Sequence, residues 1–346
     1  MINKIRGLLT QWYELNKRTL PWRDSGDAYR IWLSEIILQQ TRVEQGTPYY
    51  LAFTNRFKTI TELADASEDE ILKLWQGLGY YSRARNLHAA AKQIKNEFGG
   101  KFPTSYESII QLKGVGPYTA AAISSIAFNE AKAVVDGNVI RVISRLFGIE
   151  EAVNNAQVQK QIQTLADELL DHAKPGMFNQ AMMEFGALYC TPKNPNCAEC
   201  VLSTFCIAKK NNLVAVVPFK EKKLKRRSRF FHFIVFENEG KTFLQQRGEK
   251  DVWQGLFQFP LIETESDFEL DSDMINQNLN AEIQVNKAVK VKKHVLSHQD
   301  LWGRFYHVSG EMQNVSNYKL VSINELHTFA LPRLIDRYLE TEPFNA

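Results

Sequence analysis

The four cysteines of the chain lie together in one short segment, CTPKNPNCAECVLSTFC. Cys190, Cys197, Cys200 and Cys206 follow the spacing C-x6-C-x2-C-x5-C, which has one close pair and two flanking single thiols. Structural zinc commonly uses two close pairs, and disulfides are typical of small secreted domains rather than of chains that can bury their own core. Four thiolates from one loop favour a [4Fe–4S] cluster, with zinc and disulfides as the alternatives. Such a cluster could hold the loop in shape or transfer electrons.

Two carboxyl groups have surroundings that could adapt them for catalysis. Glu35, in DAYRIWLSEIILQQTRV, has bulky apolar residues at positions i−4, i−3 and i+3 of the same helix face. Removal from water disfavours the charged form and raises the pKa, so this carboxyl could donate a proton near neutral pH. Asp136 comes just before an expected helix with its core face at residues 139–146. It could face a cleft, although the more ordinary roles are helix capping for Asp136 and contact with solvent for Glu35.

A Gly-x-Gly turn stands before an expected helix in LKGVGPYTAAAISSIA, residues 112–127. Pro117 suits the first helical position because its missing N–H would be unpaired there in any case. The bare backbone N–H groups of such a turn at a helix N-terminus bind anions such as phosphate. An ordinary tight turn between two helices is the alternative, since short glycine motifs are weak indicators.

The elements that must position these residues are helices through residues 1–215, where apolar residues recur at helical spacing. The pattern predicts helices at 68–74, 84–98 and 158–170. Later segments are rich in aromatic and β-branched residues, which predicts strands at 230–236, 241–247, 290–296 and 303–308. We therefore expect a multidomain α and α+β protein: a helical domain over 1–215, a basic linker over 216–229 and a smaller α+β domain over 230–346.

Charge and hydropathy limit the class of protein. The chain has 42 Lys and Arg against 39 Asp and Glu, and this net charge of +3 does not by itself indicate nucleic acid. Residues 220–229, KEKKLKRRSR, are strongly basic and could be a solvated linker, while residues 261–273 are acidic. No apolar run approaches the ~20 residues of a membrane span, and no secretory h-region precedes residue 30. We expect no membrane partner and a cytoplasmic location.

Taken together, the hairpin, the aspartate after it and the four-cysteine loop resemble the helix-hairpin-helix DNA glycosylase superfamily of the endonuclease III relatives. Finer motifs are similar to one branch, the adenine DNA glycosylase or MutY family. The matching stretches follow one another in the order of that family: LPWR at 20–23, SEIILQQTRV at 34–43, GLGYYSRARNL at 77–87, LKGVGPYTA at 112–120, VDGNVIRV at 135–142 and the cysteine loop.

The resemblance implies an enzyme that extrudes adenine from a duplex and hydrolyses its N-glycosidic bond in base excision repair. Glu35 would protonate adenine at N7, and Asp136 would stabilise the oxocarbenium-like sugar, so that one carboxyl is neutral and the other ionised. Tyr118 and Asn138 would position the aspartate and the water. Bifunctional relatives carry a lysine where this chain has Tyr118, and Lys113 precedes the hairpin glycines. We therefore expect base removal without strong lyase activity.

The resemblance also implies how the chain would hold double-stranded DNA. Gln40 and Tyr80 would wedge into the base stack that the adenine leaves. The backbone N–H groups of Gly114, Val115 and Gly116 would hold phosphate, and a monovalent cation could bind the hairpin carbonyl groups.

Weaker candidates complete the predicted DNA contacts. Trp22, Arg23 and Gln180 are expected in the adenine pocket, with ordinary core or surface roles as the alternative. Lys193, in the cysteine loop, would lie against the DNA backbone. The protein is expected to act as a monomer, and as a bacterial enzyme found with the nucleoid.

The second domain resembles the Nudix-like domain of the same family. QQRGEKDVWQGLFQFP at 245–260 matches its strand and turn pattern, but no REUxEE run of acidic metal ligands follows, so we expect the fold without Nudix hydrolase activity. By resemblance, VLSHQ at 295–299 would place Ser297 and His298 against 8-oxoguanine or guanine opposite the adenine. Many relatives have phenylalanine where this chain has Leu296, which puts a stacking role there in doubt. A serine and a histidine in an ordinary turn are the alternative.

Two other functions compete with this interpretation. A glycosylase for thymine or damaged pyrimidines is compatible with Tyr118, although the second domain and its VLSHQ motif argue against it. A DNA-binding protein with a redox-sensing cluster and no catalysis is the other. Replacing Glu35 with glutamine separates enzyme from binding protein, because base release would disappear while binding survives.

Overall fold

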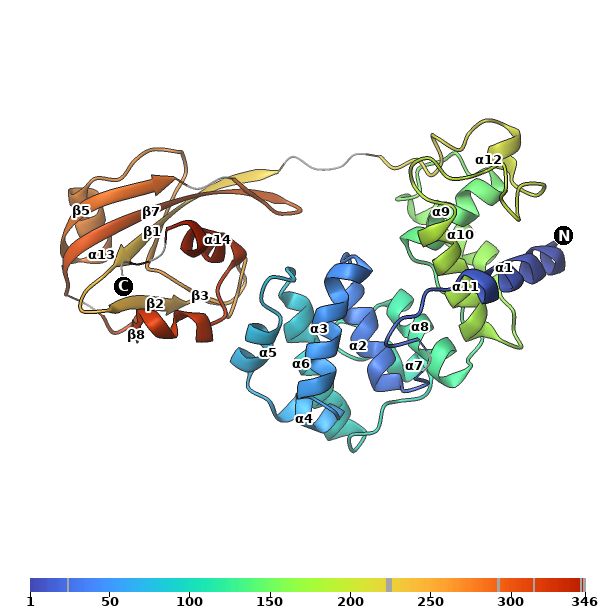
Figure 1. Cartoon of the computed structure of the whole chain (residues 1–346), viewed down its shortest axis with the longest axis horizontal. Coiled ribbons are helices and arrows are strands. Elements are labelled where there is room, and N and C mark those ends of the chain that lie inside the picture. The colour runs from blue at the N-terminus through green and yellow to red at the C-terminus, as the bar shows by residue number, and fades with distance from the viewer. Residues whose placement is uncertain (24, 222–225, 291–292, 314, 343, 345–346) are drawn as a thin grey trace. The chain divides into compact units, whose positions relative to one another are not determined.

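The computed structural model describes the chain except for residues 24, 222–225, 291–292, 314, 343 and 345–346 (Figure 1). It divides into two compact units, residues 1–65 with 86–222 and residues 66–85 with 223–346. The first unit is helical, and the second combines β-sheets with helices. This is the expected fold class. The domain limits of the sequence analysis stay predictions.

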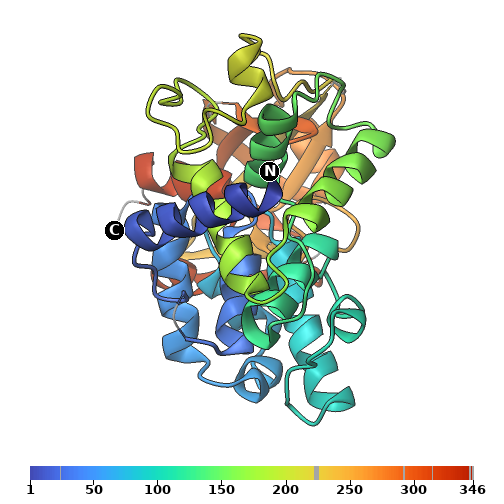
Figure 2. The same cartoon turned by 90° about the vertical axis from the view of Figure 1, so that its right-hand side faces the viewer.

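The helices of the first unit bury apolar faces against one another. They are α1 Ile2–Asn16, α2 Ala28–Leu38, α3 Val43–Arg56, α4 Ile60–Asp65, α6 Ser82–Glu97, α7 Tyr106–Ile109, α8 Pro117–Phe128, α9 Gly137–Phe147, α10 Ala156–Leu169, α11 Pro175–Leu188 and α12 Ile207–Lys210. Helix α1 lies beside α11 (Figures 1 and 2), and α9 packs on both α11 and α12. Helices α6 and α10, with α5 (Glu68–Leu74) of the second unit, confirm three of the expected helices apart from their ends.

The expected core face of α9 is confirmed, and it holds the segment that precedes the helix. Val139, Val142, Ile143 and Leu146 are buried in an apolar cluster with residues of α1, α10 and α11. Such burial, rather than helix propensity alone, supplies most of a helix's stability in a protein. The start of α9 is therefore anchored, and Asp136 is its N-cap residue.

The hairpin between α7 and α8 needs one of its glycines. Gly114 has φ +76°, and a Cβ there would lie 2.5 Å from Cβ of Asn86. Only glycine adopts this backbone conformation readily and leaves room for that contact. Gly116 has ordinary extended φ and is the N-cap of α8, with Pro117 at the first helical position as expected. The hairpin thus directs the start of α8, which carries Tyr118.

In its described residues, the second unit contains two sheets and, besides α5, three helical segments. Its strands are β1 Arg227–Phe236, β2 Lys241–Gln246, β3 Phe257–Gln258, β4 Leu261–Thr264, β5 Ala281–Lys290, β6 His294–Val295, β7 Gln299–Met312 and β8 Lys319–Ser322. One sheet has the order β4-β1-β7-β5, with β6 also paired to β7, and the other has the order β3-β2-β8. β1 and β7 are parallel, and the other pairs are antiparallel. The helical segments are α13 Ser272–Leu279, η1 Ile323–Thr328 and α14 Arg333–Thr341.

The prediction of one strand over residues 290–296 is wrong. The segment 290–296 is not one strand among the described residues: β5 ends at Lys290, residues 291–292 lie outside the description, and β6 is only His294–Val295. The chain turns at the VLSHQ motif, where the Leu296 N–H donates to the carbonyl of Gln299 at 2.8 Å. The expected strands at 230–236, 241–247 and 303–308 are confirmed within β1, β2 and β7, apart from one end residue of β2.

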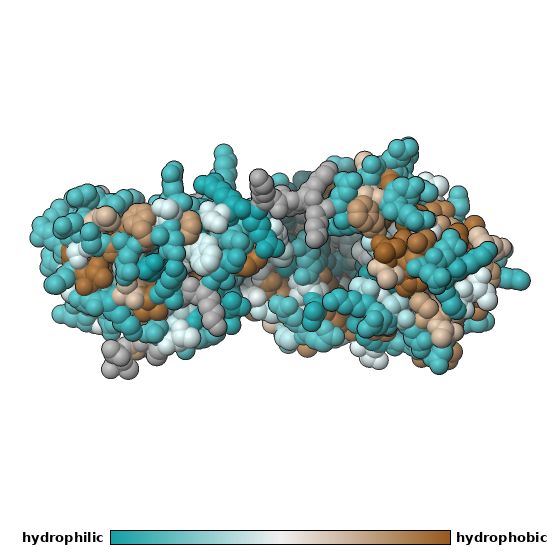
Figure 3. Space-filling view, turned by 90° about the horizontal axis from the view of Figure 1, so that it is seen from above, coloured by the Kyte–Doolittle hydropathy of each residue, from teal (hydrophilic) through white to brown (hydrophobic). Residues whose placement is uncertain are grey.

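Hydrophilic residues cover much of the face shown in Figure 3, with apolar residues between them. Within the described ranges, no helix combines the length and the apolar character that crossing a membrane requires.

Candidate active site

The hydroxyl of Tyr118 donates a hydrogen bond to Oε2 of Glu35. Glu35 lies in the last turns of α2, and Tyr118 lies at the start of α8, which packs against α2. Burial raises the pKa of Glu35 to about 7; the bond from Tyr118 opposes this change, and the charge of Asp136 adds to it. A carboxyl with this pKa holds a proton in a useful fraction of molecules at neutral pH and can donate it.

Asp136 is both the helix cap and a neighbour of this pair. Its Oδ1 accepts from the Val139 N–H at 2.7 Å, and its Oδ2 accepts from Nδ2 of Asn138 at 2.7 Å. Burial raises the pKa of Asp136, while these hydrogen bonds oppose the change by stabilising the carboxylate. The expected capping role of Asp136 is confirmed, and its role in a cleft stays a prediction.

A chain of hydrogen bonds runs from Asp136 to the cysteine loop. Arg141 donates from Nη2 to Oδ1 of Asn138 at 2.9 Å and from Nε to the carbonyl oxygen of Cys190 at 2.7 Å. Gly186 of α11 approaches so closely that a Cβ there would lie 2.7 Å from Cβ of Asn138. The amide that holds Asp136 is thereby fixed from two sides.

The four predicted cysteines line one small cavity. Arg145 closes it: its guanidinium donates to the carbonyls of Thr191 at 2.7 Å and Pro192 at 3.2 Å, and lies 3.4 Å from Sγ of Cys190. In the part of the chain that the structure describes, no three His, Cys, Asp or Glu side chains converge closely enough to hold a single metal ion. Four thiols around one cavity are the donor set that an iron–sulfur cluster uses.

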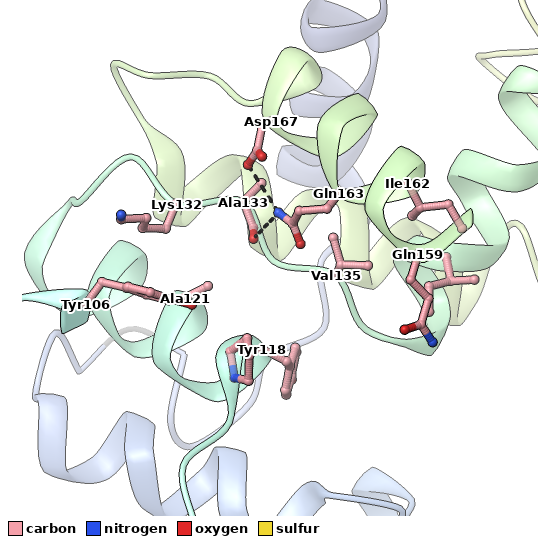
Figure 4. Close-up of a pocket in the computed structure, with 12 residues that line it drawn as sticks. Tyr106, Tyr118, Ala121, Lys132, Ala133, Val135, Gln159, Ile162, Gln163 and Asp167 are labelled. Atoms are coloured by element: carbon pink, nitrogen blue, oxygen red, sulfur yellow. Dashed lines mark hydrogen bonds between the residues drawn. The ribbon is translucent and has the colours of Figure 1, made fainter. Parts of the chain in front are cut away.

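A cavity of about 540 Å³ opens beside Tyr118, between α7, α8 and α10 (Figure 4). The side chain of Gln163, on α10, lines this cavity (Figure 4). It donates hydrogen bonds to the Ala133 carbonyl at 3.3 Å and to the carboxylate of Asp167 at 3.2 Å. Asn179 contacts the same segment, because its Oδ1 accepts a hydrogen bond from the Val134 N–H at 3.0 Å. The segment that leads into Asp136 is therefore held from α10 and α11.

The predicted wedge residues lie at exposed turns with left-handed backbone. Gln40 follows α2 with φ +55°, and Tyr80 precedes α6 with φ +49°. Such conformations are uncommon for residues other than glycine, and they occur at sites that the surrounding structure holds in place. Each side chain is exposed.

In the second unit, the structure brings Tyr80 to the VLSHQ motif. The Tyr80 hydroxyl lies 2.7 Å from Oγ of Ser297. Both residues and His298 line one cavity of about 420 Å³. Ser297 and His298 are exposed.

Comparison with known proteins places this geometry in a family. Residues 33–168 match the HhH-GPD superfamily base excision DNA repair protein, residues 190–206 the iron-sulfur binding domain of endonuclease III, and residues 231–341 the NUDIX domain. An adenine DNA glycosylase of Buchnera aphidicola (subsp. Schizaphis graminum) is 33% identical over 344 residues, which cover 96% of this chain and 97% of the relative. The human adenine DNA glycosylase is 44% identical over 60% of this chain and 40% of its own length.

The chain belongs to the adenine DNA glycosylase family.

Solved structures share the fold of much of the chain. A thermostable thymine-DNA glycosylase is 31% identical, with a TM-score of 0.57 over 61% of this chain and 97% of that one. Endonuclease III in a non-covalent complex with DNA has a TM-score of 0.52 at 20% identity over 62% of this chain and 98% of its own, a likeness of fold alone. The glycosylase is thus a DNA-binding enzyme of base excision repair, and its cysteine loop is an iron–sulfur binding segment.

One group near the site of the glycosylase escaped the sequence analysis. Glu184 of α11 is 2% exposed and accepts hydrogen bonds from Arg18 at 2.9 and 2.8 Å and from Arg23 at 3.0 Å on both oxygens. Burial alone would raise the pKa of Glu184, but the bonds from the two arginines outweigh it and lower the pKa to about 2. Its neighbour Met183 has its sulfur 3.9 Å from the Tyr118 hydroxyl.

A signal for Glu184 existed, because it is a lone charge in the apolar stretch FNQAMMEFGALY. Of the three weaker candidates, Arg23 contacts this group directly. Arg23 is held by Glu184, Gln180 accepts from the Tyr13 hydroxyl at 3.0 Å, and Trp22 is buried against Tyr50. Arg141 and Arg145 were also missed, because most of their partners are backbone carbonyls of distant segments, which no local pattern reveals.

Proposed function

We propose that the glycosylase hydrolyses the N-glycosidic bond of adenine paired with 8-oxoguanine or guanine, and leaves the DNA backbone whole. The observation that carries this proposal is the Tyr118–Glu35 hydrogen bond beside Asp136, with the pKa of Glu35 raised to about 7. Relatives that match nearly the whole chain are adenine DNA glycosylases, which supports adenine as the base removed.

In this proposal, Glu35 protonates N7 of the extruded adenine and makes it a better leaving group. The bond from the base to the sugar then breaks, and the sugar becomes oxocarbenium-like. The carboxylate of Asp136 stabilises that cation, and a water molecule adds to the sugar and gives its proton to the carboxylate of Glu35. Tyr118 orients Glu35, and Asn138 orients Asp136 through its bond of 2.7 Å. Two carboxyl groups in different surroundings thus have different roles: one donates a proton, and the other stabilises a positive charge.

Absence of lyase activity rests on the residue at the start of α8. A lyase needs an amine nucleophile that forms a Schiff base with the sugar. Tyr118 supplies a hydroxyl there, and it is engaged by Glu35. Lys113 is exposed on the other side of the hairpin glycines. We therefore propose that the product is an intact strand with an abasic site.

Recognition of the mispair is proposed for the exposed residues of both units. Gln40 and Tyr80 enter the base stack, and Ser297 and His298 read the base opposite the adenine. The hydrogen bond of 2.7 Å between Tyr80 and Ser297 supports joint action of wedge and reader. Trp22, Arg23 and Gln180 are proposed around the adenine, near the pair of Glu184 and the arginines.

The remaining DNA contacts are proposed for the backbone. The N–H groups of Gly114, Val115 and Gly116 hold phosphate, with a monovalent cation on the hairpin carbonyls. The four cysteines would hold one [4Fe–4S] cluster, which keeps the loop in shape and Lys193 against the DNA. The glycosylase acts as a monomer.

The test uses a duplex with one adenine opposite 8-oxoguanine and a label on the adenine strand. We expect strand cleavage only after hot alkali, which breaks the backbone at abasic sites. Cleavage without alkali would show that a lysine acts as nucleophile and that the proposal for Tyr118 is wrong. No cleavage in either lane, with the cluster intact, would favour a thymine mismatch as substrate, which the likeness to a thymine-DNA glycosylase also supports.

A further inference from the structure

Arg229 of the second unit makes more charged contacts than the proposed reaction explains. Arg229 lies near the start of β1 and is 9% exposed. The guanidinium donates to both carboxylate oxygens of Asp251 at 2.5 and 2.9 Å and to both of Glu263 at 2.7 and 2.6 Å. A fifth bond reaches Oε1 of Gln299 at 3.2 Å. All five donors of this planar group are therefore engaged, which fixes three chain segments relative to one another.

These three segments have different places in the fold. Glu263 belongs to β4, at the edge of the sheet. Asp251 belongs to the 249–255 turn, which connects β2 to β3. Gln299 is the first residue of β7 and ends the VLSHQ motif, directly after Ser297 and His298. Arg229 thus joins the 249–255 turn to the proposed reader.

The 249–255 turn is held in a conformation that its residues do not prefer. Trp253 has φ +61°, which is an outlier for a bulky side chain. Arg247 also anchors the turn, since it donates to the Val252 carbonyl at 2.7 Å and to the carboxylate of Asp251. The ring of Trp253 then meets His294 edge-on, with ring centroids 5.7 Å apart. Strained backbone persists only where the surroundings hold it, and it gathers at functional sites.

The turn and the reader face the same space. Asp251 and Trp253 line the cavity of about 420 Å³ together with Tyr80, Ser297 and His298. Asp251 and Trp253 have no role in the proposed function. Aromatic faces with a few fixed polar groups are suited to a nucleobase, which offers a flat ring and polar edges.

We propose that Asp251 is a specificity-determining positioning residue: by binding Arg229 it sets the 249–255 turn and the VLSHQ motif at the spacing that admits an oxidised purine. The ligand class is the purine base opposite the excised one, with its additional oxygen at the edge. The inference rests on the proposed function, in which Tyr80, Ser297 and His298 read that base.

The test compares Asp251→Asn with Glu263→Gln. Each variant keeps the side-chain shape but turns one carboxylate partner of Arg229 into an amide with N–H groups that face its donors. Only Asp251 belongs to the cavity wall, whereas Glu263 lies on β4. Single-turnover base release from adenine opposite 8-oxoguanine and opposite guanine gives a discrimination ratio, and thermal melting gives the stability of each protein.

We expect Asp251→Asn to lower the discrimination ratio about tenfold, the value of one well-placed hydrogen bond, and Glu263→Gln to leave it nearly unchanged at a comparable melting temperature. Equal ratios in both variants and the wild type would overturn the inference and leave the proposed function standing. A parallel fall in both variants that follows their melting temperatures would also overturn it, because the role of the cluster would then be stability alone. A wild-type ratio near one would overturn the proposed reading of 8-oxoguanine itself.

Discussion

Arg141 donates from Nε to the carbonyl oxygen of Cys190 at 2.7 Å, while its Nη2 lies 2.9 Å from Oδ1 of Asn138. One side chain therefore connects a cysteine of the iron–sulfur segment with the amide that holds Asp136. Hydrogen bonds thus connect the cysteine loop with Asp136, the carboxylate proposed to react, so the shape of the loop can influence the site.

Replacing Arg141 with lysine should weaken both ends of this connection. A single ammonium cannot reproduce the planar fork that reaches Asn138 and Cys190 together. We expect slower single-turnover base release. We also expect the variant to retain roughly tenfold less cluster than the wild type, which is the size of effect seen when residues that support metal ligands are replaced. Visible absorbance of the purified protein reports the cluster. Full absorbance with full activity would contradict this connection.

Base release should depend on the protonated form of Glu35. Its pKa is raised to about 7, so the protonated acid predominates below that pH and is lost as pH rises through it. Single-turnover rates should therefore fall on the alkaline side of about pH 7. Glu35→Gln should slow base release at least about 100-fold, the range for a lost general acid, and retain binding to the mispair. Loss of binding along with release would point to a structural role.

Tyr118→Phe tests the partner of that acid. The hydroxyl favours the charged form of Glu35 and so lowers its pKa, in opposition to burial. Without the hydroxyl, the pKa should rise further, and the alkaline limb of the rate profile should move to higher pH. The readout is the midpoint of that limb, not the rate itself. A midpoint shifted toward lower pH would show that the hydroxyl stabilises the neutral acid instead.

Glu184→Gln should destabilise the first unit at neutral pH. The variant leaves Arg23, buried to 9% side-chain exposure, without its charged partner. We expect a loss of about 3 kcal/mol in the free energy of unfolding, which is the range for breaking one buried ion pair. Because the pKa of Glu184 is lowered from 4.5 to about 2, its contribution is complete above pH 4.5 and declines as the pH falls toward 2. Urea unfolding of both proteins at several pH values should show their stabilities converging in acid.

Two hairpin glycines offer a matched pair. Gly114 has φ +76° and no room for a Cβ beside Asn86, whereas Gly116 has ordinary φ and nothing within 4 Å of an added Cβ. Gly114→Ala should lower the free energy of unfolding by more than about 1 kcal/mol, and Gly116→Ala should change it less. Equal effects would show that the hairpin relaxes around either alanine.

If the proposed phosphate contacts form, DNA binding should weaken steeply with salt, because phosphate contacts release counterions. Affinity for a duplex at several salt concentrations measures this directly. A flat dependence would contradict phosphate contacts.

Several features around the candidate site could be predicted from the amino-acid sequence, because their signals are local. The apolar neighbours of Glu35 along one helix predicted a raised pKa, and the structure gives that direction. The cysteine spacing predicted a cluster loop, and the glycine hairpin with Pro117 predicted the start of α8. Each of these depends on residues a few positions apart, where backbone geometry fixes which side chains are neighbours.

Contacts between segments that are distant in the sequence were decided by the tertiary structure alone. Arg18 and Glu184 are 166 residues apart in the chain, and Arg229 meets Gln299 across 70. The parallel pairing of β1 with β7 likewise depends on where the folded sheet brings two remote strands. The expected strand at 290–296 is wrong, because β5 ends at Lys290 and β6 is only His294–Val295 among the described residues. Such pairs carry no periodic signal, since their partners are selected by global packing and by the need to satisfy buried charges.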